Sequence, residues 1–324
     1  MSTQFDLFES NALAATDAEV ATLTRPQREE RLDALVAESR KILAAGVSRV
    51  HAEGKTLAGI AVLFSGGNDS TTLAHLFRRD ATHAIHANTT VGIELTREYV
   101  RATCKAWGLP LIERTPPREE DHYRALVLDQ GFPGPGHHYK MFQRLKERGL
   151  RAARAEIVRD SRRERVLYVA GRRRSESTRR ASIPENGADR SYPSIEWVSP
   201  LIHWTKPDLM TYRLRHRDVP RNQASDLIHM SGECLCGAFA QEGERAELDY
   251  WYGADLELIR ELEAELQRPE YDHIPAYRKA WGWGSDPTAR AAATARELKP
   301  TSGALCDACA GRWDQPALTD GGAA

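Results

Sequence analysis

Short apolar segments alternate with helical patterns over the first two thirds of the chain. The first, Leu57 to Phe64, lies between charged and glycine-containing stretches, which predicts a strand buried on both faces. Further strands are predicted at Thr82 to Ala87, Leu109 to Glu113, Val166 to Ala170 and Ile195 to Pro200. Helices are predicted at Pro26 to Ala52, Thr71 to Arg79, Glu94 to Trp107, His138 to Arg163 and Lys206 to Arg217. This alternation predicts an α/β fold in which right-handed βαβ units build a parallel sheet with helices on both faces.

The two ends of the chain follow other patterns. Residues before about Thr24 show no periodicity, which predicts an N-terminal arm over residues 1–25. Glu242 to Gln267 has the pattern of one long acidic helix, and the tail beyond Pro300 is rich in Gly, Ala and Asp. We therefore expect an α/β domain over residues 26–230 and a mainly helical region over residues 231–324.

The composition is typical of a globular protein. The chain has 324 residues, 45 of them Lys or Arg and 46 Asp or Glu, so its formal net charge is -1. No apolar stretch approaches the roughly 20 residues that a membrane-spanning helix needs. Acidic residues precede the first basic residue, unlike in a secretory signal. These features predict a cytoplasmic protein without a membrane span.

The positive charges are unevenly distributed. The stretch from Arg144 to Arg180 holds 14 Lys and Arg against 5 acids, a local balance of +9. Such clustering predicts a polyanion partner, either nucleotide phosphate or nucleic acid. For Arg148 to Arg165 the alternative is a solvated helical face, because charges of both signs are mixed there.

A second signal follows the first predicted strand, where Ser65-Gly66-Gly67-Asn68-Asp69-Ser70 leads into a helix. Two glycines let the backbone approach a ligand closely, and the helix start presents unpaired N–H groups and the positive end of its dipole. The serines add hydroxyl donors. The segment therefore predicts a phosphate-binding loop, although not one of the GxxxxGK[ST] type, because it has no lysine.

This loop resembles the PP-loop of the ATP pyrophosphatase superfamily, whose members cleave ATP between the α and β phosphates. The resemblance implies that Ser65, Gly66, Gly67, Asn68, Asp69 and Ser70 hold the pyrophosphate of ATP. It further implies that Asp69 is catalytic and helps to place Mg²⁺, an ion that prefers oxygen ligands.

Two later segments narrow the resemblance to the phosphoadenosine phosphosulfate (PAPS) reductase family. Gly171-Arg172-Arg173-Arg174-Ser175-Glu176-Ser177-Thr178-Arg179-Arg180 resembles its GxRRxxSxxR segment, and the residues from Pro200 to Asp208 resemble its PLxxWTxxD segment. The resemblance implies catalytic roles for Arg173 and Arg174, whose guanidinium groups would neutralise polyphosphate charge. It implies nucleotide-binding roles for Gly171 and Arg180. Trp204 either contacts adenine or packs in the core.

Four of the five cysteines form two close pairs, Cys234 with Cys236 and Cys306 with Cys309, and 69 residues separate the pairs. Four thiolates brought together would hold either Zn²⁺ or an iron–sulfur cluster. The family resemblance favours a [4Fe–4S] cluster, with Zn²⁺, unligated cysteines or a disulfide as alternatives. Cys104 lies in a predicted helix and is expected in the core.

The intact loop favours ATP cleavage, whereas sulfonucleotide reductases usually carry a degenerate loop. The chain also lacks the ECGLH-like segment of those reductases, and His137 to Lys146 holds no cysteine. We therefore predict an ATP-dependent sulfurtransferase, similar to the PAPS-reductase-like component of bacterial DNA phosphorothioation systems. Its expected partners are nucleic acid, bound through Arg144 to Arg180, and a cysteine desulfurase as sulfur donor. The alternatives are a PAPS or adenylylsulfate reductase and a non-catalytic nucleotide-binding partner of DNA.

Overall fold

The computed structural model describes residues 13–298, with gaps at 177–179, 181–182, 185 and 190–193. Two compact units divide the chain. Unit 1 comprises Met1–Ala87, Glu94–Arg114 and Gly149–Glu233, and unit 2 comprises Asn88–Ile93, Thr115–Arg148 and Cys234–Ala324. The chain thus passes between the units more than once, and each unit is described by itself below.

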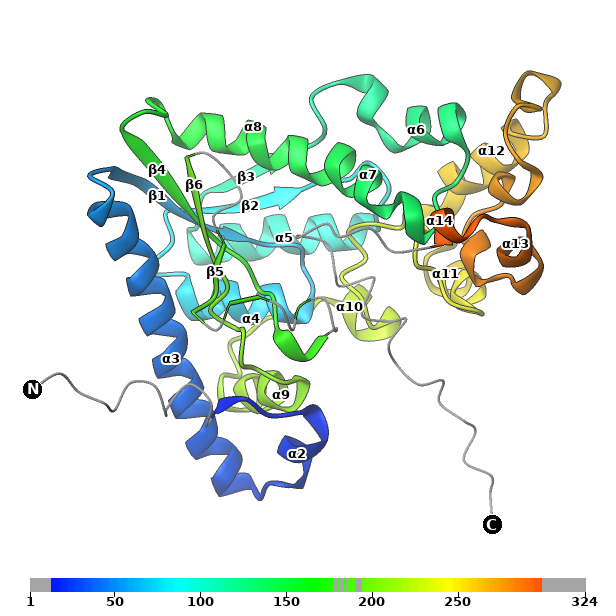
Figure 1. The fold of residues 1–324 in the computed structure, drawn as a ribbon. Coiled ribbons are helices and arrows are strands. Elements are labelled where there is room, and N and C mark those ends of the chain that lie inside the picture. Colours follow the sequence, from blue (N-terminus) through cyan, green and yellow to red (C-terminus); the bar gives the residue numbers. More distant parts are fainter. Residues whose placement is uncertain (1–12, 177–179, 181–182, 185, 190–193, 299–324) are drawn as a thin grey trace, which may run out of the picture. The chain divides into compact units, whose positions relative to one another are not determined.

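Unit 1 is built on a sheet whose strand order is β3-β2-β1-β4-β6-β5. The strands are β1 Thr56–Leu63, β2 His83–Ala87, β3 Leu111–Arg114, β4 Glu164–Val169, β5 Ala188–Asp189 and β6 Ile195–Val198. The pairings from β3 to β6 are all parallel, and the short β5 pairs antiparallel with β6 at one edge. The predicted α/β fold with a parallel sheet is therefore confirmed (Figure 1).

Helices cover both faces of this sheet. The helices of unit 1 are α2 Asp17–Thr22, α3 Arg25–Ala52, α4 Asn68–Phe77, α5 Glu94–Trp107, α8 Arg148–Ile157, α9 Lys206–Arg215 and α10 Gln223–Ile228. The main apolar core joins α3, α4, α5 and α9 to one face, where Val62, Leu167 and Val169 point. On the other face, the Tyr168 hydroxyl donates to the Leu150 carbonyl of α8 at 2.8 Å. The alternation along β4 explains this division, because successive strand residues point to opposite faces.

Two residues singled out in the sequence lie in this core. Trp204 is 1% exposed, so its core placement is confirmed. Cys104 is equally buried, and burial raises the pKa of its thiol to about 12. A thiol held neutral in this way is a packing residue rather than a nucleophile or ligand.

The N-terminal segment is more regular than the sequence predicted. Asp17–Thr22 forms the helix α2, and Thr16 caps it in a reciprocal arrangement with Glu19. The Glu19 amide donates to the Thr16 hydroxyl at 3.2 Å, and the Thr16 amide donates to the Glu19 carboxylate at 2.7 Å. This local capping box supports a helix too short to show apolar periodicity.

Unit 2 is mainly helical. Its elements are η1 Glu119–Asp121, α6 Tyr123–Gln130, η2 Pro135–His137, α7 His138–Phe142, η3 Gln143–Glu147, α11 Glu244–Tyr252, η6 Gly253–Leu256, α12 Glu257–Glu265, η7 Pro269–Tyr271, η8 Ala276–Lys279, η9 Trp283–Ser285, α13 Pro287–Ala292 and α14 Ala295–Leu298. Among the described residues, no helix is both long and apolar enough to cross a membrane.

Two predicted helices are interrupted. The acidic helix expected at Glu242 to Gln267 is divided into α11 and α12 by the short turn η6, which begins at Gly253, a poor helix former. The helix expected at His138 to Arg163 contains the π-helical turn η3 and ends at Ile157. Hydrophobic periodicity did not reveal either interruption.

Candidate functional site

The candidate site lies in unit 1 at the carboxyl ends of β1 and β4. From β1 the chain adds β2 and β3 on one side of the sheet, and later adds β4 and β6 on the other. The segments that follow β1 and β4 therefore leave the sheet next to each other. In open parallel sheets this reversal of strand order is where ligands bind.

The loop after β1 has an open helix start. Gly66 has a φ of +83°, and a Cβ there would lie 2.8 Å from Cγ2 of Thr96, so both the backbone conformation and the space require glycine. Gly67 is the N-cap residue of α4, and within the described part of the chain no side-chain hydrogen bond caps this helix. The first amides of α4 are thus left for an outside acceptor. The hydroxyls of Ser65 and Ser70 lie 3.1 Å apart beside them.

Residues far along the chain hold this loop. The Asn222 side-chain amide donates to the Gly66 carbonyl at 3.0 Å and to the Thr96 hydroxyl at 3.1 Å. The Thr96 hydroxyl in turn donates to the Ser231 carbonyl at 2.9 Å. A Cβ at Gly67 would lie 3.1 Å from Cβ of Ser231, so the loop packs closely there. The sequence analysis missed Asn222, Thr96 and Ser231, since no local pattern marks them.

Asn68, a predicted binding residue, has its side chain engaged within the protein. The Arg213 guanidinium of α9 donates to its side-chain oxygen. The same Arg213 nitrogen lies 3.7 Å from a carboxylate oxygen of Asp226 in α10. These contacts tie the first turn of α4 to two later helices.

Asp69 and Arg173, both predicted to be catalytic, form an ion pair. Nε of Arg173 donates to Oδ1 of Asp69 at 2.7 Å, and Nη1 donates to the Ser175 hydroxyl at 3.1 Å. Glu176 lies 3.5 Å from Nη2 of Arg173 and also pairs with Arg180. The Arg173 side chain is 3% exposed, whereas the Asp69 side chain is 28% exposed. Arg173 is therefore enclosed by its partners, and Asp69 is accessible to a ligand.

The other residues of the segment after β4 have different roles. A Cβ at Gly171 would lie 3.3 Å from the Asp69 carbonyl carbon, so the end of β4 rests directly on the loop. Arg172 is buried, donates to the Ser199 hydroxyl at 2.8 Å and stacks over Trp197, which indicates a structural role. The amide of Arg174 donates to the Ile202 carbonyl at 3.0 Å, and its side chain lines a cavity.

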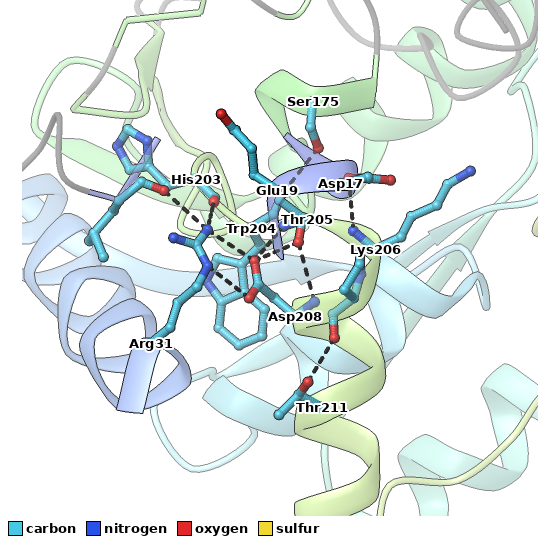
Figure 2. A network of polar contacts seen from close by, with 12 residues as sticks. Asp17, Glu19, Arg31, Ser175, His203, Trp204, Thr205, Lys206, Asp208 and Thr211 are labelled. Atoms are coloured by element: carbon cyan, nitrogen blue, oxygen red, sulfur yellow. Dashed lines mark hydrogen bonds and ion pairs between the residues drawn. The ribbon is translucent and has the colours of Figure 1, made fainter. Parts of the chain in front are cut away.

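The residues from Trp204 to Asp208 act structurally (Figure 2). The Trp204 indole donates to the Ser39 hydroxyl at 3.0 Å within the core. Thr205 caps α9, and its amide and hydroxyl donate to the Asp208 carboxylate at 2.8 and 2.7 Å. Arg31 of α3 binds the same carboxylate through two nitrogens, at 3.0 and 3.1 Å. The segment from Pro200 to Asp208 thus joins α9 to α3, and its one acidic residue, Asp208, is buried and not accessible to a ligand.

The basic residues from Arg144 to Arg180 are divided between the two units. Arg144 and Arg148, in unit 2, pair with the buried Asp121. In unit 1, the exposed Arg159, Arg162 and Arg163 lie between the end of α8 and the start of β4. They therefore stand at the amino edge of the sheet, opposite the edge that carries the loop.

Cys234 and Cys236 lie in unit 2 on a firmly held segment. The Leu235 amide between them donates to the Val91 carbonyl at 2.6 Å, and the Leu235 carbonyl accepts from the Trp281 indole at 2.8 Å. The Tyr123 hydroxyl donates to the Cys236 carbonyl at 3.0 Å. Burial raises the pKa of Tyr123 well above its usual value, so it remains a donor.

Both thiols line one small cavity. Its other lining residues come from α7 and the π-helical turn, namely His138, Met141, Phe142, Leu145 and Lys146. Neither cysteine forms a disulfide within the described chain. Cys306 and Cys309 lie outside the described residues, and among the described ones no group of three or more His, Cys, Asp or Glu is arranged to hold a metal ion. Two thiols opening on one cavity fit half of a four-thiolate ligand set.

Sequence comparison identifies the family of the α/β unit. The model for the phosphoadenosine phosphosulfate reductase domain matches residues 59–224, which are 166 of the 324 residues. The chain belongs to the PAPS reductase domain family. The match to this family contains the loop after β1 and the segments after β4 and β6, and it ends before Cys234. No curated protein matches the chain.

Solved structures of low sequence identity resemble this member of the PAPS reductase domain family. PAPS reductase from Candida auris in a phosphate complex has a TM-score of 0.42 at 17% identity, covering 64% of this chain and 93% of that one. FMN adenylyltransferase from Candida glabrata in complex with FAD and inorganic pyrophosphate has a TM-score of 0.40 at 12% identity, covering 68% and 67%. Yeast FAD synthetase in complex with FAD has a TM-score of 0.35 at 13% identity, covering 64% of each chain. Likeness at this level concerns the fold alone.

Proposed function

We propose that the protein is an ATP pyrophosphatase that activates an acceptor for sulfur transfer. The observation that carries this proposal is the open start of α4, where Gly67 leaves the first helix amides uncapped beside the Ser65 and Ser70 hydroxyls. Unpaired amides, hydroxyl donors and the positive end of a helix dipole are complementary to pyrophosphate. Membership of the PAPS reductase domain family supports a nucleotide as the ligand.

In this mechanism an oxygen of the acceptor attacks the α-phosphorus of ATP, and the bond to the β-phosphate oxygen breaks. The loop amides stabilise the charge that develops on the leaving pyrophosphate. Asp69 would hold Mg²⁺ through its accessible carboxylate, and the ion would neutralise phosphate charge. Arg173 orients that carboxylate through the 2.7 Å hydrogen bond. Arg173 is thus a positioning residue, and Arg174, which lines a cavity at the same edge of the sheet, is the candidate for contact with a phosphate of the acceptor.

The outer sulfur of a cysteine persulfide then attacks the activated phosphorus of the acceptor and displaces AMP. A second thiol attacks the inner sulfur of that persulfide, so that a disulfide forms and the phosphorothioate is released. We propose that the sulfur is supplied by a cysteine desulfurase and enters through Cys234 and Cys236, together with Cys306 and Cys309. An iron–sulfur cluster bound by these four thiolates would supply a site at which sulfur is held, with Zn²⁺ as the alternative occupant. The cavity that Cys234 and Cys236 share supports a common ligand.

The proposed acceptor is a phosphate group of a nucleic-acid backbone. The exposed arginines from Arg159 to Arg163 lie at the amino edge of the sheet, away from the loop. A phosphate bound by these arginines is therefore not the one that reacts at the loop, so the reacting phosphate needs a separate binding point at the carboxyl edge of the sheet. There, Arg174 is the basic residue that lines a cavity.

The decisive assay incubates the protein with ATP and Mg²⁺, with and without DNA, and measures pyrophosphate and AMP. We expect both products, and we expect Ser65→Ala to lower their rate about tenfold, the value of one hydrogen bond. Ser48→Ala, which removes an exposed hydroxyl on α3, is the matched control and leaves the rate unchanged. ATP binding without either product under all conditions would contradict the proposal and favour a non-catalytic nucleotide-binding protein.

The family match favours a second candidate, reduction of PAPS or adenylylsulfate. A reductase would release sulfite when supplied with thioredoxin and either sulfonucleotide, and would form no pyrophosphate from ATP. Measuring sulfite and pyrophosphate in parallel separates the two functions.

Metal analysis tests the cysteine site. We expect protein purified without oxygen to contain iron and acid-labile sulfide with the visible absorption of an iron–sulfur cluster. Cys234→Ala should remove most of the iron, whereas Cys104→Ala should retain it, because Cys104 is buried in the core of unit 1. A colourless protein with one zinc ion per chain would show that the cysteines bind Zn²⁺ and not an iron–sulfur cluster.

A further inference from the structure

A second cavity opens at the carboxyl edge of the sheet in unit 1, apart from the loop. It measures about 280 Å³ and is lined by Ala14, Ala15, Arg174, Ser175, Ile202, His203 and Trp204. These residues come from the segment before α2 and from the segments that follow β4 and β6. Pockets for whole small ligands usually measure about 300–1,000 Å³. The cavity is therefore suited to a single functional group with a few attached atoms.

Its polar lining is linked to the loop through Arg173. The Ser175 hydroxyl accepts from Nη1 of Arg173 at 3.1 Å, while Nε of the same guanidinium donates to Asp69. Ser175 also donates to the Trp204 carbonyl at 3.2 Å. The Arg173 guanidinium thus bonds both to a residue of the loop and to a residue that lines the cavity. Among the residues that line the cavity, Arg174 carries the permanent positive charge that suits an oxyanion.

The opposite wall of the cavity is apolar and is fixed by one arginine. Nη2 of Arg31 donates to the Leu13 carbonyl at 3.1 Å and to the His203 carbonyl at 3.3 Å, while the guanidinium also binds Asp208. Figure 2 shows the Arg31 guanidinium between the Asp208 carboxylate and the carbonyl of His203. This arginine therefore ties the segment that carries Ala14 and Ala15 to the loop that carries His203.

We propose that this cavity is a second oxyanion subsite, which takes the phosphodiester group of the acceptor while ATP occupies the loop. The inference rests on the proposed function, since it names where that function's acceptor binds. Arg174 would bind the oxyanion, and Ala14, Ala15 and Ile202 would pack against the attached carbon atoms. The limited volume selects one phosphate group, so the rest of a nucleic acid would lie outside the cavity.

Binding of dimethyl phosphate, a minimal phosphodiester, tests the subsite. Phosphorus NMR would follow its binding to the full chain in the presence of saturating Mg²⁺ and pyrophosphate, which occupy the loop. We expect binding to persist under these conditions. Arg174→Gln should weaken it about 10- to 100-fold, the value of a charge-assisted hydrogen bond. Loss of binding on addition of pyrophosphate would show a single shared site and overturn the proposal.

A steric variant tests the cavity without changing its charge. Ala15→Leu places a larger side chain in the cavity wall and should abolish dimethyl phosphate binding, while Ala18→Leu, at an exposed position of α2, should not change it. Equal binding by both variants would overturn the proposal. Dimethyl phosphate binding in a protein that forms no pyrophosphate would leave the subsite standing and contradict only the ATP-cleaving function. Pyrophosphate formation without dimethyl phosphate binding would support the ATP-cleaving function and overturn the proposed subsite.

Discussion

Two aspartates near the same edge of the sheet differ in how completely their carboxylates are bonded. Asp208 is fully buried and accepts four hydrogen bonds, two from Arg31 and two from Thr205. Asp69 is 28% exposed, and among the described residues its carboxylate bonds only to Arg173. A saturated carboxylate joins helices, whereas an accessible one with remaining acceptor capacity is free to bind a cation. Both carboxylates lie in family-like motifs, so the motif match alone does not separate the two roles.

The largest expected effect is on stability, from Arg31→Met. This change leaves the buried Asp208 carboxylate without its counter-charge, and breaking such a pair costs about 3–5 kcal/mol. Urea denaturation would measure the free energy of unfolding. The control is Arg40→Met, whose ion pair with Asp80 is exposed and should contribute at most about 1 kcal/mol. Equal losses for both variants would show that the Arg31–Asp208 ion pair stabilises the fold no more than an exposed pair does.

The next effect is on catalysis, from Asp69→Asn. Loss of the proposed Mg²⁺ ligand should lower pyrophosphate formation about 10²- to 10³-fold, as removal of one transition-state contact does elsewhere. The free energy of unfolding should fall by only about 1–3 kcal/mol, because the asparagine side-chain oxygen still accepts a hydrogen bond from the buried Arg173. The assay pairs initial rates with urea denaturation. A rate unchanged within twofold would remove Asp69 from the catalytic site.

A smaller effect separates the capping box of α9 from that of α2. Thr205→Ala removes a cap of α9 and a donor to the buried Asp208, so we expect a loss of about 1–2 kcal/mol in the free energy of unfolding. Thr16→Ala removes the exposed cap of α2 and should cost about 0.5 kcal/mol. If Thr16→Ala proved the more destabilising, the capping box of α2 would matter more than its exposure suggests.

The smallest effect concerns pH and the other end of α9. His75 is buried, accepts from the Tyr212 hydroxyl at 2.8 Å and donates to Asp218 at 3.0 Å. Burial lowers the pKa of His75 below the value of 6.5 expected in the unfolded chain. Its contribution to stability is therefore present above about pH 6.5 and is lost as the pH falls toward the depressed pKa.

The free energy of unfolding of the wild type should accordingly fall between pH 7.5 and 5.5 more steeply than that of His75→Gln. Parallel profiles for the two proteins would show that His75 does not titrate in this range. The comparison uses the same buffer ionic strength throughout, since Asp218 and Arg78 face the same imidazole.

Much of the fold of unit 1 was predictable because its signals are local. Buried parallel strands give short apolar runs, and β1, β2, β4 and β6 lie within a few residues of the predicted ranges. The prediction of one acidic helix over Glu242 to Gln267 was wrong because the pattern of apolar residues continues across the break. The turn that divides the helix begins at a single glycine, Gly253. The capped helix α2 was missed because its six residues are too few to show a period.

The candidate site was predictable only where its residues are consecutive. The loop from Ser65 to Ser70 carries its own glycine and serine pattern, so the sequence identifies it. Asn222 is 156 residues from Gly66, and nothing in its surroundings marks it as the donor to that loop. The sequence predicted a contact between Arg173 and phosphate, but it could not show which residues surround the guanidinium. In the structure these are Asp69, Ser175 and Glu176.

Two groups of arginines flank strand β4 along the chain. The exposed Arg159, Arg162 and Arg163 precede its first residue, and Arg173 and Arg174 of the candidate site follow its last. Six strand residues at about 3.3 Å each separate the two groups by about 20 Å. This exceeds twice the Debye length of about 8 Å at physiological ionic strength, so mobile ions largely screen one group from the other. A ligand would therefore meet two independent electrostatic fields, and the local balance of +9 along the sequence does not describe the field at either one.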